Sequence, residues 1–171
     1  MILPNNSKLH NLSDLKKRIA GWQLKNDSIV FTNGCFDVLH PGHIQYLKEA
    51  KALGNRLIIG LNTDNSVKRQ NKGADRPINS EESRAFMLAG LHSVDGIVLF
   101  DDDTPLNLIE ELKPNILVKG ADYDKACTDS SNKNYIVGSK EVLSYGGKVE
   151  TIEFLEGFST TNFLERVRKI G

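Results

Sequence analysis

The chain of 171 residues lacks the features of several large classes of protein. Its longest apolar runs lie near residues 57–61 and 97–100, far short of the ~20 residues that a membrane-spanning helix needs. Its first residues show no basic segment followed by a long apolar core, so we expect no secretory signal. Neither charge is in excess, with 22 basic and 22 acidic residues, whereas a broad nucleic-acid surface needs an excess of basic groups. We therefore expect neither membrane nor nucleic-acid partners.

Cysteine is also scarce. Cys35 and Cys127 are the only two, and they do not form a Cys-x-x-Cys pair. We therefore expect thiols in a reducing compartment, without a thiolate metal site, and we expect the protein to be cytoplasmic. The charged fraction of 26% and the hydrophobic fraction of 39% are ordinary for a globular domain, and one domain is the default at this length.

Short apolar runs alternate with longer stretches of helical periodicity. The patterns predict five strands, near residues 29–31, 56–61, 96–100, 115–118 and 148–154. They predict helices near residues 41–53, 80–91, 104–113, 136–145 and 160–170, with Ser80 and Thr104 as N-caps and Pro105 at the first helical position. The alternation indicates an α/β fold: a single doubly wound, Rossmann-like domain with a five-stranded parallel sheet. Its ligand site should lie at the carboxyl ends of the strands, at the switch point in strand order.

The first 24 residues are expected to form a helical extension packed on the outside of the domain formed by residues 25–171. Leu12, Leu15 and Ile19 have the spacing of an amphipathic helix. Residues 124–134 are polar and predict an exposed loop.

The candidate site begins where the first buried strand ends. Residues 32–43 have the sequence Thr-Asn-Gly-Cys-Phe-Asp-Val-Leu-His-Pro-Gly-His. Gly34 permits an unusual turn and close approach of a ligand, and Pro41 begins a helix whose first N–H groups form an anion site. His40 and His43 flank that helix start, so two imidazoles can face a bound phosphate.

Other interpretations of these residues stay open at this point. The two histidines could be a metal pair, although zinc ligands on a helix more often have i, i+4 spacing, or they could be ordinary capping side chains. Cys35 is expected to pack at the strand end rather than act as a nucleophile. The acidic residues 101–103 are expected to complement a helix dipole rather than bind a metal. No protein metal ligands are predicted.

The segment 32–43 resembles the Gly-x-Phe-Asp-x-x-His-x-Gly-His signature of the nucleotidylyltransferase (cytidylyltransferase-like) superfamily. The resemblance covers almost the whole chain, because four further segments fit the family pattern: residues 60–64, 72–77 with 82–84, 119–123 and 158–161. Together they look most like the adenylyltransferases that act on D-glycero-β-D-manno-heptose 1-phosphate. Many relatives carry a ribokinase-like kinase as well, and this chain is expected to resemble the form without it.

The resemblance implies a function in lipopolysaccharide core heptose metabolism. A sugar 1-phosphate oxygen would attack the α-phosphorus of ATP directly, giving ADP-heptose and pyrophosphate. ATP is then a substrate, and Mg²⁺ would be held mainly by phosphates and water. The resemblance also implies a homo-oligomer, such as a dimer.

The expected site residues fall into three groups by role. The expected catalytic residues are His40, His43 and Lys72. The expected ATP-binding residues are Thr32, Asn33, Gly34, Cys35, Phe36, Asp37, Gly42, Lys119, Gly120, Phe158, Ser159 and Thr160. The expected sugar phosphate-binding residues are Asp64, Arg76 and Asp122.

Some roles have simpler alternatives. Ser159 could be only an N-cap, and Lys72 and Arg76 could belong to a solvated basic loop. The signature alone does not choose the nucleobase, so glycerol-3-phosphate cytidylyltransferase, or another small-molecule nucleotidylyltransferase, is an alternative. A nucleotide-binding domain without turnover is another. An NAD-binding domain is disfavoured because Gly-x-Gly-x-x-Gly is absent after the first strand.

Overall fold

The structure is a computed structural model that describes residues 7–70, 76–155, 157–160 and 163. Six parallel strands form one sheet in the order β1-β4-β3-β2-β5-β6. The strands are β1 (Leu9–His10), β2 (Ile29–Gly34), β3 (Arg56–Asn62), β4 (Gly96–Phe100), β5 (Ile116–Gly120) and β6 (Lys148–Ile152). The helices are α1 (Leu12–Gln23), α2 (Pro41–Ala52), α3 (Asp64–Arg69), α4 (Glu81–Ala89), α5 (Leu106–Leu112) and α6 (Ser139–Ser144).

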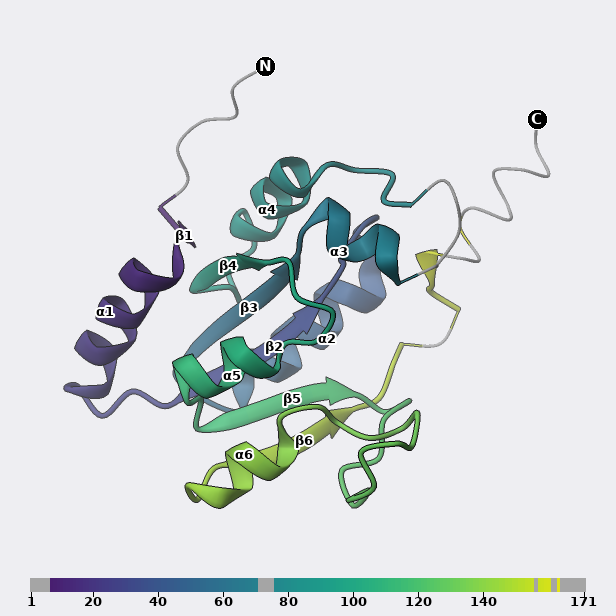
Figure 1. Cartoon of the computed structure of the whole chain (residues 1–171). Coiled ribbons are helices and arrows are strands. Elements are labelled where there is room, and N and C mark those ends of the chain that lie inside the picture. Colours follow the sequence, from purple (N-terminus) through teal and green to yellow (C-terminus); the bar gives the residue numbers. More distant parts are fainter. Residues whose placement is uncertain (1–6, 71–75, 156, 161–162, 164–171) are drawn as a thin grey trace, which may run out of the picture.

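Side-chain alternation along the strands builds two cores, one on each face of the sheet. In β2, Ile29 and Phe31 pack with α1, α5 and α6, whereas Val30 packs with α2 and α4. Figure 1 shows these helices on opposite sides of the sheet. This confirms the predicted α/β class and doubly wound architecture. From β2 the chain adds β3 and β4 on one side and then β5 and β6 on the other, so the switch point lies between β2 and β5.

All five predicted strands are present, and β1 adds a short sixth. Leu9 and His10 pair with Ile97 and Val98 of β4 at the edge of the sheet. A two-residue strand has no periodicity of its own, so the sequence could not reveal it.

Helix α1 contributes to the main core. Leu15, Ile19 and Trp22 are buried in the same cluster as residues of β2 to β6. Trp22 is 9% exposed, and the guanidinium carbons of Arg18 and Arg56 lie 5.3 and 5.1 Å from its ring centroid.

Three helices differ from the sequence prediction. Helix α3 is absent from the prediction, because Val67 is its only aliphatic residue and six residues show no helical periodicity. The prediction of Thr104 as a cap is wrong: Pro105 is the N-cap of α5 and no side chain caps it. Helix α6 begins at Ser139 rather than near residue 136, because the φ of 88° at Gly138 is not compatible with a right-handed helix. The predicted helix over residues 160–170 lies mostly outside the described residues.

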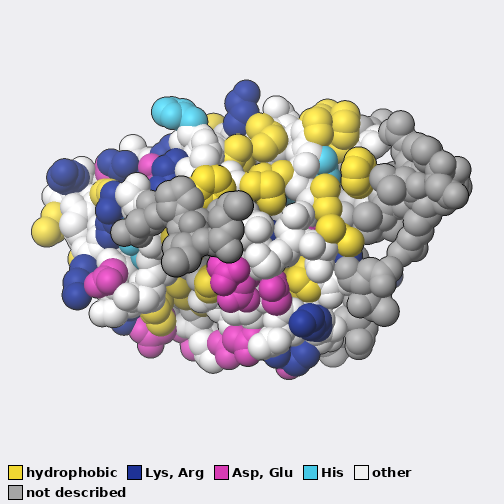
Figure 2. Space-filling view, turned by 90° about the horizontal axis from the view of Figure 1, so that it is seen from above, with side chains coloured by type: hydrophobic (Ala, Val, Ile, Leu, Met, Phe, Trp, Pro, Cys, Tyr) yellow, Lys and Arg dark blue, Asp and Glu magenta, His cyan; other side chains and the backbone are white. Residues whose placement is uncertain are grey.

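The surface carries charges of both signs. On the face seen from above, basic and acidic side chains are interspersed among apolar ones (Figure 2). Within the described residues, no helix combines the length and apolar character needed to cross a bilayer.

Candidate functional site

A cavity of about 910 Å³ opens at the carboxyl ends of the strands. Its wall is formed by the ends of β2 and β5, the start of α2 and the segment after β6, so it lies at the switch point. Most of the predicted site residues meet there. They are Asn33, Gly34, Cys35, Phe36, His40, Gly42, His43, Lys119, Gly120, Asp122, Phe158, Ser159 and Thr160.

The two histidines form a stacked pair at the start of α2. His40 is the N-cap in an extended conformation, Pro41 follows it, and the His40 Nδ1 accepts a hydrogen bond of 3.3 Å from the His43 N–H. The ring centroids are 3.8 Å apart with an interplanar angle of 21°. The capping and ligand-facing interpretations are therefore compatible, because one nitrogen of His40 caps the helix and the ring still lines the cavity.

Both imidazoles are neutral near pH 7. Burial lowers the pKa of His40, and burial, followed by the charge of His40, lowers the pKa of His43 to about 4. Because the Nδ1 of His40 accepts a hydrogen bond, we assign its proton to Nε2, which makes that nitrogen a donor. The pair can donate to an anion without itself carrying charge.

Glycine allows close packing at the helix start. A Cβ at Gly42 would lie 3.1 Å from the His40 ring and 3.3 Å from the Phe158 Cβ. Any side chain there would push these groups apart. Gly42 therefore lets the segment after β6 approach the beginning of α2.

Lys119 is the only lysine or arginine among the described residues that line the cavity. Its Nζ donates to the Asn33 Oδ1 at 2.9 Å and lies 4.9 Å from the Tyr123 ring centroid. This contact joins the ends of β5 and β2 across the switch point. Lys119 thus lines the same cavity as the two histidines.

Four predicted residues are not on the cavity wall. The buried Thr32 hydroxyl lies 2.7 Å from the Tyr46 hydroxyl, which in turn donates to the Val118 carbonyl at 3.2 Å. This chain of hydrogen bonds joins α2 to both strands of the switch point. The other three, Asp37, Asp64 and Arg76, belong to ion pairs behind the wall. Lys72 lies outside the described residues.

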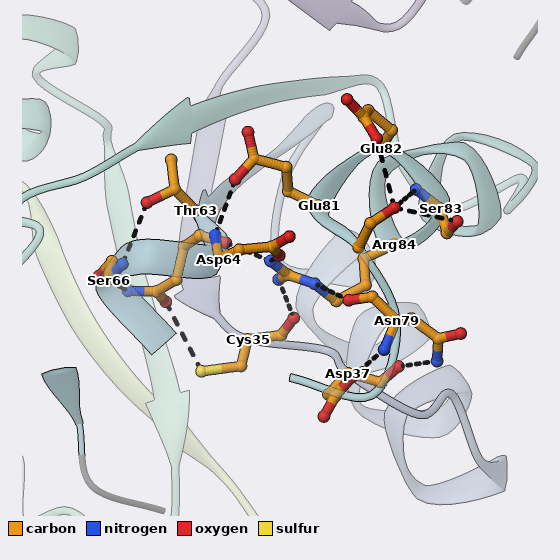
Figure 3. Close-up of polar contacts among 12 residues, drawn as sticks. Cys35, Asp37, Thr63, Asp64, Ser66, Asn79, Glu81, Glu82, Ser83 and Arg84 are labelled. Atoms are coloured by element: carbon orange, nitrogen blue, oxygen red, sulfur yellow. Dashed lines mark hydrogen bonds and ion pairs between the residues drawn. The ribbon is translucent and has the colours of Figure 1, made fainter. Parts of the chain in front are cut away.

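Arg84 of α4 was not predicted as a site residue and does not line the cavity. It joins the loop after β2, the end of β3 and the segment before α4 (Figure 3). Its side chain is fully buried. It donates to the main-chain carbonyls of Cys35, Asn62 and Asn79 at 2.6, 2.8 and 3.1 Å, and to the Asp64 carboxylate at 2.8 Å. The only sequence signal for it was its place in the family-like segment 82–84.

A second ion pair lies next to it. The buried Asp37 carboxylate accepts from the Arg76 Nε at 2.5 Å and from the main-chain N–H groups of Ile78 and Asn79, both at 2.9 Å. Every one of these donors comes from the segment that leads into α4. Asp37 therefore anchors that segment to the end of the β2 loop.

The acidic residues 101–103 contact α3. Asp103 and Asp101 form ion pairs with Arg69 at 2.8 and 3.6 Å, and the Asp101 carboxylate accepts from the Thr63 hydroxyl. Among the described residues, no three His, Cys, Asp or Glu side chains are grouped as metal ligands would be. The Asp102 carboxylate accepts from the Asn107 side-chain amide at 3.3 Å.

Sequence reasoning also missed part of the cavity wall. The missed lining residues are Tyr46, Asn62, Gln70, Asp103, Thr104, Pro105, Tyr123, Val137, Phe154, Leu155 and Gly157. Most have no motif around them and reach the wall only through the fold. Three had a usable signal: Tyr46 has helical spacing, three residues after His43, and Asn62 and Tyr123 lie in the family-like segments 60–64 and 119–123.

Comparison with known proteins places the chain in a family. Residues 31–166 match the cytidylyltransferase-like family. The chain is 46% identical over 164 residues to the bifunctional protein HldE of Geotalea uraniireducens, and 50% identical over 153 residues to that of Marinomonas sp.. These matches cover 96% and 90% of this chain but only 32% and 30% of those proteins. The chain thus spans about a third of their length.

Two solved structures share the architecture. The lipopolysaccharide core biosynthesis protein of Thermoplasma volcanium is 30% identical, with a TM-score of 0.56 over 75% of this chain and 97% of that one. The pantoate-beta-alanine ligase of Francisella tularensis, complexed with beta-gamma ATP and beta-alanine, is 16% identical, with a TM-score of 0.60 over 95% and 77% of the two chains. The second likeness shows the fold alone. From the family match and the close relatives, the chain belongs to the cytidylyltransferase-like family.

Proposed function

We propose that the protein transfers an adenylyl group from ATP to D-glycero-β-D-manno-heptose 1-phosphate, giving ADP-heptose and pyrophosphate. The observation that carries this proposal is the stacked, neutral His40–His43 pair at the start of α2, facing a cavity at the switch point. Its hydrogen-bond donors and the helix N-terminus suit the triphosphate of a nucleotide. The chain matches about a third of relatives that are named bifunctional, and we propose that this part carries the adenylyl transfer.

Transfer of this kind depends on positioning and charge stabilisation more than on covalent chemistry. We propose that the His40 Nε2–H and His43 donate to oxygens of the α-phosphate as charge builds there. The residue types at positions 119, 159 and 160, one ammonium and two hydroxyls, suit the remaining phosphate oxygens. The sugar phosphate is already ionised near neutral pH, so no general base is needed. This agrees with the engagement of Asp37 in an ion pair.

Mg²⁺ would enter with the nucleotide as part of the substrate. Asp122 and Asp103 line the cavity, and their carboxylates have the oxygen chemistry that Mg²⁺ accepts. Asp103 is already paired with Arg69, so phosphate oxygens and water would supply most of the ligands.

A pyrophosphate-release assay tests the proposal. ATP, CTP and GTP are each combined with heptose 1-phosphate and with glycerol 3-phosphate. We expect release only with ATP and heptose 1-phosphate. Release with CTP and glycerol 3-phosphate would favour the cytidylyltransferase alternative, and absence of release from every pair would favour a binding domain without turnover.

A second assay tests the direct attack. If the sugar phosphate attacks ATP without a covalent enzyme intermediate, labelled pyrophosphate should not exchange into ATP when the sugar is absent. Clear exchange would indicate a nucleotidyl-enzyme and would contradict the proposed mechanism.

We further propose that the protein acts in the cytoplasm, where ATP is available, and as a homo-oligomer. Light scattering coupled to size-exclusion chromatography measures the second point. A mass of 19.0 kDa at working concentration would contradict an oligomer.

A further inference from the structure

Phe36, in the middle of the site loop, has a left-handed backbone with a φ of 46°. A bulky residue rarely adopts this conformation, because its Cβ crowds the neighbouring backbone. Such a residue keeps the conformation only where its surroundings fix it, and such residues cluster at functional sites. The contacts on either side of Phe36 therefore need an explanation.

The peptide before Phe36 is fixed from α4. Arg84 donates to the Cys35 carbonyl at 2.6 Å, and its remaining donors hold the end of β3 and the segment before α4. Figure 3 shows the Arg84 guanidinium between Cys35, Asp64 and Asn79. Because the C=O and N–H of a trans peptide point in opposite directions, this contact turns the Phe36 N–H away from Arg84.

The residue after Phe36 is fixed from the same segment. Asn79 donates its main-chain N–H to the Asp37 carboxylate at 2.9 Å and its side-chain Nδ2 to the Asp37 carbonyl at 2.5 Å. Arg84 in turn holds the Asn79 carbonyl at 3.1 Å. Arg84 thus contacts Cys35, before Phe36, and also holds Asn79, whose side chain is hydrogen-bonded to Asp37 after Phe36.

The left-handed backbone places the Phe36 ring against the histidine pair. The ring folds back over Gly34, where an added Cβ would lie 3.0 Å from the Phe36 Cε2. It lies 5.3 Å from the His43 ring with an interplanar angle of 59°. His43 is in turn stacked on His40. A continuous path of contacts therefore runs from α4 to the proposed phosphate donors.

We propose that Arg84 is a positioning residue: by holding the Cys35 carbonyl it keeps Phe36 left-handed, and the Phe36 ring keeps His43 stacked on His40. Arg84 itself touches no substrate. Its effect on rate rests on the proposed function, whereas its effect on the geometry of the histidines does not.

The rate experiment compares two conservative variants. Arg84→Lys keeps the charge opposite Asp64 but loses the planar fork that reaches three carbonyls at once. The matched control is Arg56→Lys, because Arg56 is likewise paired with carboxylates, those of Asp27 and Asp95, but lies at the start of β3 and does not line the cavity. Since small misplacements of reacting groups are costly, we expect Arg84→Lys to lower kcat about tenfold or more, with little change in the KM for ATP. We expect Arg56→Lys to keep the wild-type kcat.

The geometry experiment needs no substrate. The His43 imidazole is titrated by NMR in the wild type and in both variants. In Arg84→Lys the pKa of His43 should rise from about 4 toward its ordinary value of 6.5, because loss of the Phe36 ring admits water. Arg56→Lys should leave it unchanged.

The outcomes separate the two proposals. A wild-type protein that releases no pyrophosphate would contradict the proposed function, and the titration would still decide the role of Arg84. A His43 titration and a kcat that are both unchanged in folded Arg84→Lys would overturn the positioning role. An equal fall of kcat in both variants would also overturn it. If Arg84→Lys does not fold, Asn79→Ala, which removes only the contact to the Asp37 carbonyl, should shift the His43 titration in the same direction, and an unshifted titration would count against the proposal.

Discussion

Two sets of arginine–carboxylate pairs, one at each end of the parallel sheet, differ in burial. At the amino ends, Arg56 pairs with Asp27 and Asp95, and these side chains are 34%, 18% and 16% exposed. At the carboxyl ends, the Arg84 and Asp37 side chains are fully buried in their pairs with Asp64 and Arg76. Solvent reaches the first set in part, so we expect breaking one of those pairs to cost less than breaking a fully buried pair.

The buried pairs have a different consequence. Each buried charge is also hydrogen-bonded to main-chain groups: Arg84 to three carbonyls, and Asp37 to two N–H groups. Removing one partner would leave a desolvated charge and unpaired backbone groups. These two buried pairs thus fix loops beside the cavity, whose described lining residues include the two neutral imidazoles, Lys119, Asp103 and Asp122. The comparison suggests four tests, from the largest expected effect to the smallest.

His40→Ala should have the largest effect. Loss of one preorganised donor to a developing charge costs about 3 kcal/mol of barrier, so pyrophosphate release should fall about a hundredfold or more while ATP still binds. His92→Ala, at an exposed position outside the cavity, is the matched control and should keep the wild-type rate. An unchanged rate in His40→Ala would remove the histidine from the mechanism.

Asp37→Asn should destabilise the fold by about 3 kcal/mol, because the amide presents a donor where the carboxylate accepts from three donors and it leaves Arg76 uncompensated. Urea unfolding followed by circular dichroism measures this loss. A loss below about 1 kcal/mol would show that burial does not distinguish the two ends of the sheet.

Acid should weaken the carboxyl end through His43. Its folded pKa of about 4 lies below the ordinary 6.5, so the unfolded chain binds more protons between these values. The stability is therefore complete above pH 6.5 and falls as the pH drops toward 4, by about 1–2 kcal/mol between pH 7 and pH 5. Denaturant midpoints at these two pH values should differ less in His43→Gln than in the wild type. An equal difference in both proteins would assign the acid sensitivity to other groups.

Asp27→Asn should have the smallest effect. It breaks the 2.8 Å contact to the Arg56 Nε at the amino end, and we expect a loss of no more than about 1 kcal/mol, with pyrophosphate release unchanged. The same unfolding assay, repeated at high salt, should show a smaller difference still. If Asp27→Asn lowered the free energy of unfolding as much as Asp37→Asn does, the two sets of ion pairs would not differ in their contribution to stability.

Local signals in the sequence predicted much of this fold. Ser80 caps α4, Pro41 opens α2, and the apolar run Ile29 to Phe31 lies in the buried strand β2. Each of these features depends on residues close together in the chain. For the same reason the segment 32–43 located the proposed phosphate site before any tertiary contact was known.

The remaining features depend on contacts between distant residues. Arg84 reaches Cys35 and Asn62, 49 and 22 residues away, and no periodicity encodes such a partner. The left-handed Phe36 follows from those contacts, because phenylalanine does not favour a positive φ by itself. Thr32 was expected at the triphosphate and lies instead against Tyr46, which only the packing of α2 on the sheet decides.

The burial of Trp22 gives the protein a natural optical probe. It is the only tryptophan of the chain and is 9% exposed. It belongs to α1 and packs in the main core, with the Arg56 guanidinium over its ring. It does not line the cavity. Its fluorescence should therefore report the loss of the whole fold and stay constant when a nucleotide binds, so that unfolding and ligand titrations can be followed in one sample without interfering with each other.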